Sequence, residues 1–164
     1  MKRKVVELII ILLFFVLQIT LGRVVSIGGI KPNLLIILPV MLGFLNGRNE
    51  GMFVGFFAGL LYDLNASVLF GFSALVYTYI GYFAGIFSGD YDDNFNLIPI
   101  GILLGGNFAY GFLSYVGNFL LHNRLDVMFF VSRYIVPEMI YTVLVMVILY
   151  KPLIFINRKL ERKV

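Results

Sequence analysis

Asp63 is the most conspicuous residue that could do chemistry, because it ends a stretch in which glycine recurs every fourth residue. The glycines are Gly51, Gly55 and Gly59. Three steps of four residues place Asp63 about 18 Å along a helix from Gly51. A carboxylate so far into a membrane costs at least about 2.5 kcal/mol, so it must face a bundle interior or a cavity. It is either a binding or ion-coupling carboxylate, or one that satisfies the exposed end of a short helix.

A second candidate is Glu138, which directly follows Pro137 in another apolar stretch. Pro137 lacks a backbone donor and kinks a helix. Arg133 precedes Glu138 and either extends outward to the membrane surface or pairs with a buried carboxylate. A buried ion pair that joins two segments fits this pattern as well as a functional role does.

The sequence predicts neither a catalytic site nor a metal site, and it implies no cofactor. It contains no cysteine and one histidine, His122, in the polar stretch HNRLD. It lacks the G-x-S-x-G, H-E-x-x-H and Walker A motifs and any metal-binding cluster of carboxylates. We therefore expect a protein that is not an enzyme.

The composition predicts an all-α integral membrane protein. The chain has 164 residues, of which 60% are hydrophobic and 13% charged, whereas soluble domains have about 25% charged residues. The apolar runs are unbroken, as in residues 5–21, and this favours helices over the alternating strands of a barrel.

The elements that must position these residues are six apolar segments in a single transmembrane domain, residues 1–164. They cover approximately residues 5–22, 33–45, 49–64, 69–87, 97–121 and 127–150. The first, fourth, fifth and sixth are long enough to span a bilayer. The second, which Pro32 and Asn33 open, and the third are short. They are tilted spans, a re-entrant pair, or helices buried inside the bundle.

Orientation follows from the basic residues, which cluster at the two ends of the chain. An even number of spans places both termini on one side, and the positive-inside rule makes that side the cytoplasm. We predict several passes through the membrane, and the family resemblance described below implies that this is the bacterial inner membrane. This clustering also argues against nucleic acid as a partner.

Small residues form three rows at helical spacing, and such rows let membrane helices approach closely. The first row is Gly51, Gly55 and Gly59. The second is Gly81, Ala84, Gly85 and Gly89, and the third is Gly101, Gly105 and Gly106. The rows serve packing within the bundle, or one row is left open for the helix of a partner.

Residues 31–85 resemble the rod shape-determining protein MreD family. The family pattern is P-[DN]-L-L-L, then a G-x-x-x-G-[LF]-x-x-G-L-L-x-D segment, then G-x-x-A-L-x-Y-x-x-x-G-Y. Here Pro32 to Leu35, Gly55 to Asp63 and Gly71 to Tyr82 fit it in order. The resemblance implies a non-enzymatic scaffold that binds MreC, a single-span protein, and supports lateral peptidoglycan synthesis and rod shape. MreB, RodZ, RodA and a penicillin-binding transpeptidase complete the implied complex.

The same resemblance implies a fold similar to the substrate-binding subunits of energy-coupling-factor transporters. It therefore supplies an alternative function, a solute-binding membrane subunit of a vitamin-type transporter. The first segment lacks the Ala-x-x-x-Ala face that such subunits commonly carry, which counts against this alternative. For the scaffold function, Asp63 and the face formed by Gly51, Gly55 and Gly59 are the predicted contact region. Pro32, Asn33, Arg133, Pro137 and Glu138 are the predicted buried polar or structural residues.

Overall fold

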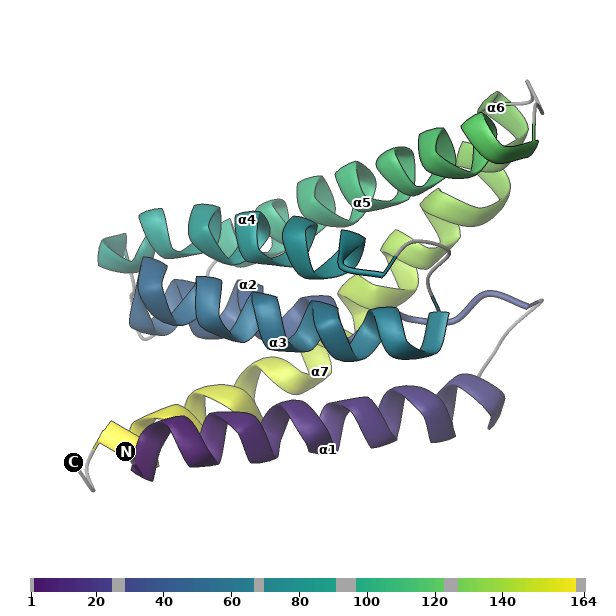
Figure 1. The fold of residues 1–164 in the computed structure, drawn as a ribbon. Helices are drawn as coiled ribbons and strands as arrows, with labels where there is room; N and C mark the ends of the chain where they lie inside the picture. The colour runs from purple at the N-terminus through teal and green to yellow at the C-terminus, as the bar shows by residue number, and fades with distance from the viewer. Residues whose placement is uncertain (1, 25–28, 67–69, 91–96, 123–126, 162–164) are drawn as a thin grey trace.

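The described part of the chain is mostly helical, with short turns and the segment 29–33 between the helices. A computed structural model describes residues 2–24, 29–66, 70–90, 97–122 and 127–161 (Figure 1). In chain order the helices are α1 (Lys2–Val24), α2 (Leu34–Asn46), α3 (Arg48–Ala66), α4 (Phe72–Ile86), the short η1 (Ser88–Asp90) and α5 (Ile98–His122). A continuous helical segment follows, formed by α6 (Val127–Phe130), η2 (Val131–Ile135) and α7 (Val136–Glu161).

Helix α2 lies at the centre of the bundle. Residues 34–44 are all buried, and α2 contacts α1, α3, α4, α5 and α7. Its sequence is apolar on every side, as expected for a helix that other helices surround. The short second segment is therefore a core helix, which was one of the three interpretations left open by the sequence.

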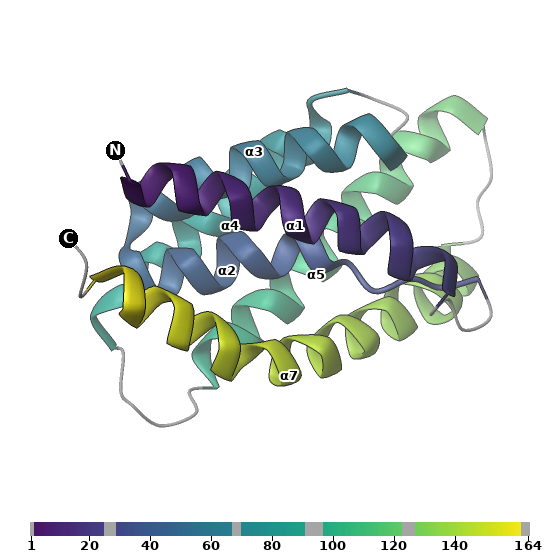
Figure 2. The same cartoon turned by 90° about the horizontal axis from the view of Figure 1, so that it is seen from below.

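Helices that follow one another along the chain run in alternating directions, so both termini lie at one end of the bundle (Figures 1 and 2). The turn between α2 and α3 lies at this same end. It is made by Gly47, whose φ of 97° favours glycine. We call this end the terminal end and the other the distal end. The distal end contains the C-terminus of α1, the start of α2, the end of α3 and the start of α7.

The helix boundaries lie near the predicted segment boundaries, with one clear exception. The sixth segment was expected to end at residue 150, before Pro152, but α7 continues through Pro152 to Glu161. Pro152 removes only one backbone donor. Leu153 and Asn157 beyond it are buried at 2% and 5% exposure, so packing against the bundle extends the helix.

Two helical stretches are long and apolar enough to cross a bilayer within the residues described: Ile98–Gly117 and Val127–Lys159. The apolar helices α2 and α4 are shorter, with 13 and 15 residues. Large apolar side chains such as Leu12, Phe108 and Leu144 are exposed on the outer surface. Such a surface suits a lipid environment rather than water. The number of spans remains a prediction.

Candidate functional site

The glycine face of α3 lies directly against α4. A methyl group added at Gly51 would lie 2.7 Å from the carbonyl carbon of Gly81, and one at Gly55 would lie 2.6 Å from that of Tyr77. One at Gly59 would lie 2.6 Å from the amide nitrogen of Ala74. Moving forward along α3 from Gly51 to Gly59, the contact moves backward along α4 from Gly81 to Ala74. The two helices are antiparallel and in backbone contact.

The second small-residue row supplies the other side of this contact. Gly81 packs on Gly51, and Gly85 packs on the backbone of Gly47 and Arg48. The third row differs, because a methyl group at Gly101 or Gly105 would meet nothing within 4 Å. The first row, with Gly81 and Gly85 of the second, is therefore filled by the contact between α3 and α4. In the row on α5, Gly101 and Gly105 are open, whereas Gly106 packs against Ile80 of α4.

Asp63 caps the N-terminus of α4. Its carboxylate accepts backbone hydrogen bonds from Gly71 (2.8 Å), Ser73 (3.1 Å) and Ala74 (3.2 Å). These amides belong to the first turn of α4 or precede it, where backbone donors have no partner within the helix. Asp63 is 5% exposed. Its geometry corresponds to the structural interpretation, in which it satisfies the end of a short helix.

Asn33 ties three helices together at the distal end. Its side chain accepts a hydrogen bond from the amide of Ile36 (3.3 Å) and donates one to the hydroxyl of Tyr77 (2.6 Å). Its own amide donates to Oγ1 of Thr142 on α7 (3.1 Å). Pro32 is buried beside it, and its carbonyl accepts from Nε2 of Gln18 (2.9 Å). These two residues therefore position α2 against α1, α4 and α7.

Pro137 follows a π-helical turn, η2. The amide of Val136 bonds to the carbonyl of Val131, five residues back. Pro137 has no amide hydrogen to continue a regular ladder, and wide turns of this kind are found at prolines and at functional sites. Both Pro137 and Glu138 are half-buried.

The expectation of a buried Arg133 was wrong. Arg133 is exposed, with its guanidinium carbon 5.8 Å from the centre of the Phe129 ring. Ile135 is the residue of η2 that faces the bundle, where it packs against Gly111. Arg133, two residues earlier, therefore points outward, and it forms no ion pair with Glu138.

A polar cavity of about 360 Å³ lies at the distal end. Its lining comes from α1, α3, η2 and α7 and from the segment before α2. It includes Gln18, Lys31, Asn33, Tyr62, Asn65, Tyr134 and Glu138. Asp63 is not among the lining residues, so the structure separates the two carboxylates that the sequence singled out.

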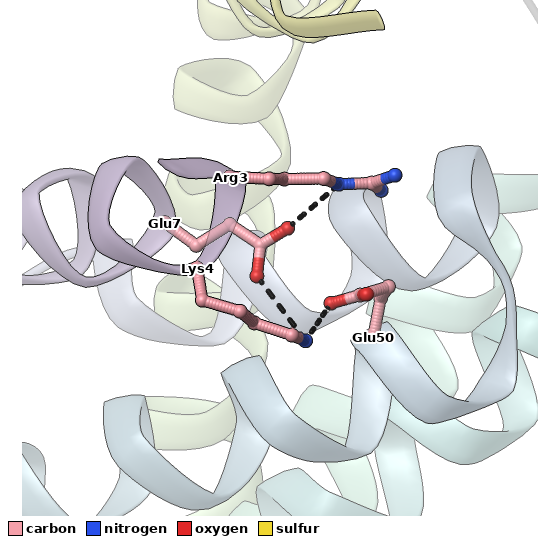
Figure 3. A network of polar contacts seen from close by, with 4 residues as sticks. All are labelled: Arg3, Lys4, Glu7 and Glu50. Carbon is pink, nitrogen blue, oxygen red and sulfur yellow. Dashed lines mark hydrogen bonds and ion pairs between the residues drawn. The ribbon is translucent and has the colours of Figure 1, made fainter. Parts of the chain in front are cut away.

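A charge cluster at the terminal end was missed by the sequence analysis (Figure 3). Nε of Arg3 donates to Glu7 at 3.1 Å, and Nζ of Lys4 lies 3.6 Å from the same carboxylate. Lys4 also pairs with Glu50 at the start of α3. Glu7 is 1% exposed. Buried charges require such partners, so the cluster fastens α1 to α3. A single acidic residue in the apolar run 5–21 was the available signal.

The contacts described above are close helix packing, hydrogen bonds and ion pairs. No group of three or more His, Cys, Asp or Glu side chains suited to a metal ion occurs among the residues that the structure describes.

Comparison with known proteins gives one match. A family model described as rod shape-determining protein MreD matches residues 2–160. No curated protein and no solved structure matches the chain. The expected likeness to the substrate-binding subunits of energy-coupling-factor transporters therefore remains a prediction.

Proposed function

The chain belongs to the rod shape-determining protein MreD family, and we propose that it is a non-enzymatic membrane scaffold of the cell-elongation complex. Membership of this family implies a membrane component of rod-shape determination. The finer proposal is that the chain binds the transmembrane helix of MreC and so supports lateral peptidoglycan synthesis. The match over nearly the whole chain is the observation that carries it.

The structure changes which surface is proposed for MreC. The face formed by Gly51, Gly55 and Gly59 was expected to take part, but a partner's helix would have to displace α4 to reach it. The open row on α5 is the better candidate. Gly101, Gly105 and Ala109 are all exposed and follow each other at steps of four. Small residues at this spacing allow close approach of another helix in lipid.

A groove beside this row supports the assignment. It measures about 450 Å³, lies between α4 and α5, and is lined almost entirely by apolar atoms. Leu75, Tyr79 and Phe83 of α4 form one wall, and Gly105 and Ala109 lie on the other. We propose that the MreC helix lies along this groove.

Co-purification of MreC with this chain from detergent tests the proposal. Gly105→Leu should fill the groove and reduce the recovered MreC several-fold. Gly89→Leu is the matched control, because a side chain at Gly89 also meets open space but lies outside the groove. If a folded Gly105→Leu variant retains MreC as well as Gly89→Leu does, the groove is not the interface. If the wild-type chain retains no MreC, the scaffold proposal itself fails.

The alternative function, a solute-binding subunit of a vitamin-type transporter, is favoured by one observation, the polar cavity of about 360 Å³. Its volume falls within the range of small-molecule sites, about 300–1,000 Å³. A thermal-shift screen against vitamins tests this alternative. Stabilisation by one vitamin would favour it, and no stabilisation by any would count against it.

A further inference from the structure

The cavity at the distal end is lined by several polar groups that other contacts already occupy. Gln18 donates to the carbonyl of Pro32 and accepts from the amide of Leu34 (2.7 Å). Asn33 uses its side chain on Ile36 and Tyr77. These two amides therefore shape the wall of the cavity, and their hydrogen-bonding groups are engaged in holding helices together.

Glu138 differs from these residues. The carboxylates of Glu7 and Glu50, at the opposite end of the bundle, have Arg3 and Lys4 as ion-pair partners. The backbone carbonyl of Glu138 accepts a hydrogen bond from Thr142 (2.7 Å), but its carboxylate has no hydrogen-bond or ion-pair partner in the described ranges. The side chain is half-buried and lines the cavity. A carboxylate in such a place normally has a partner.

We propose that the cavity binds a small organic cation, an ammonium group, with the Glu138 carboxylate as its counter-ion. This inference is independent of the proposed MreC contact, which lies on α4 and α5. The ammonium group can belong to a soluble amine or to the headgroup of a zwitterionic lipid.

The other lining residues fit this ligand class. Tyr62 and Tyr134 place two aromatic rings in the wall, and organic cations are attracted to the faces of such rings. Lys31 also lines the cavity and is exposed, so its ammonium group can receive the negative end of a zwitterion. The volume of about 360 Å³ is near the lower limit for small-molecule sites, so the bound group must be compact.

Thermal unfolding of the purified full-length chain in detergent tests the proposal. The soluble probe is ethanolamine, and ethylene glycol is its neutral analogue of similar size. The lipid probe is a nanodisc of phosphatidylglycerol with or without phosphatidylethanolamine. A ligand that binds the folded state raises Tm. We expect the wild-type Tm to rise with ethanolamine, with phosphatidylethanolamine, or with both, and not with ethylene glycol.

The Glu138→Gln variant isolates the charge. It keeps the side-chain size and the backbone bond to Thr142, so it should fold. Loss of a charged hydrogen-bond partner should weaken binding by at least about tenfold. Lys151→Gln is the matched control, since Lys151 is exposed on the same helix and outside the cavity. It should leave the shift unchanged.

Each outcome decides the proposal. A shift with ethanolamine that Glu138→Gln abolishes supports a soluble amine, and one seen only with phosphatidylethanolamine supports a lipid headgroup. The proposal is overturned if no probe shifts Tm, or if Glu138→Gln responds like the wild type. MreC co-purification, measured on the same variants, reports separately on the scaffold proposal.

Discussion

Replacing glycine by alanine should lower the stability of the fold at Gly55 and raise it at Gly105. At Gly55 the added methyl group would lie 2.6 Å from the carbonyl carbon of Tyr77 and 2.9 Å from the amide nitrogen of Thr78. Both are backbone atoms and cannot rotate away. Carbon atoms in contact lie about 3.5–4.0 Å apart, so α3 and α4 must separate by about 1 Å. At Gly105 the methyl group would meet nothing within 4 Å.

The magnitudes follow from this geometry. A separation of about 1 Å forfeits about a quarter to a half of each nearby dispersion contact. Over-packing of this kind costs about 1–3 kcal/mol, and we take about 3 because backbone meets backbone. Alanine returns about 1 kcal/mol as the better helix former. Gly55→Ala should therefore destabilise the fold by about 2 kcal/mol, while Gly105→Ala should stabilise it by about 0.5–1 kcal/mol.

Unfolding by sodium dodecyl sulfate in mixed micelles measures both values. Far-ultraviolet circular dichroism is the suitable signal, because the fold is helical and the chain contains no tryptophan. Opposite signs for the two variants are expected. If both variants change stability in the same direction and by similar amounts, close backbone contact between α3 and α4 does not determine the stability of this interface.

Three further predictions concern the polar contacts and the wide helical turn. Asp63→Ala should destabilise the fold by about 2–4 kcal/mol, because it removes the acceptor of the Gly71, Ser73 and Ala74 amides. Hydrogen exchange at these amides should become faster. Unchanged exchange would contradict the capping role. Glu7→Gln should destabilise the fold by about 1–2 kcal/mol. A double-mutant cycle of Lys4→Met with Glu50→Gln should give a coupling energy distinct from zero; additive effects would show that the cluster in Figure 3 does not hold α1 to α3. Pro137→Ala should let η2 become regular α-helix and rotate the preceding segment by about 100°. Cysteines placed at Tyr115 and Phe130, whose ring centres are 5.0 Å apart, should then cross-link less than they do when Pro137 is kept. Equal cross-linking would refute the rotation.

The helices and the glycine contact were largely accessible from the sequence, because both depend on local patterns. Apolar runs predicted each helix, and steps of four residues placed Gly51, Gly55 and Gly59 on one face. Which helix fills that face was not accessible. Gly81 and Gly101 both follow the same small-residue pattern, and only the fold distinguishes the filled row from the open one.

The polar contacts were less accessible, because they join residues far apart in the chain. Lys4 meets Glu50, and Asn33 meets Thr142, and neither pairing follows from a local pattern. Glu7 was overlooked because it interrupts an otherwise apolar run, and its burial depends on Arg3 and Lys4. Arg133 was misplaced because a π-helical turn sets which side of the segment faces the bundle.

The central position of α2 has a consequence for how the chain is made. Its 13 residues extend only about 20 Å, less than the bilayer core of about 30 Å. Synthesis proceeds from the N-terminus, so α2 is produced before most of the helices that surround it. Thr142 on α7 accepts a hydrogen bond from the amide of Asn33, directly before α2, and it is synthesised 109 residues after Asn33. Until α7 is made, α2 therefore lacks one of the helices that pack against it, and a truncation before α7 leaves that side of α2 uncovered.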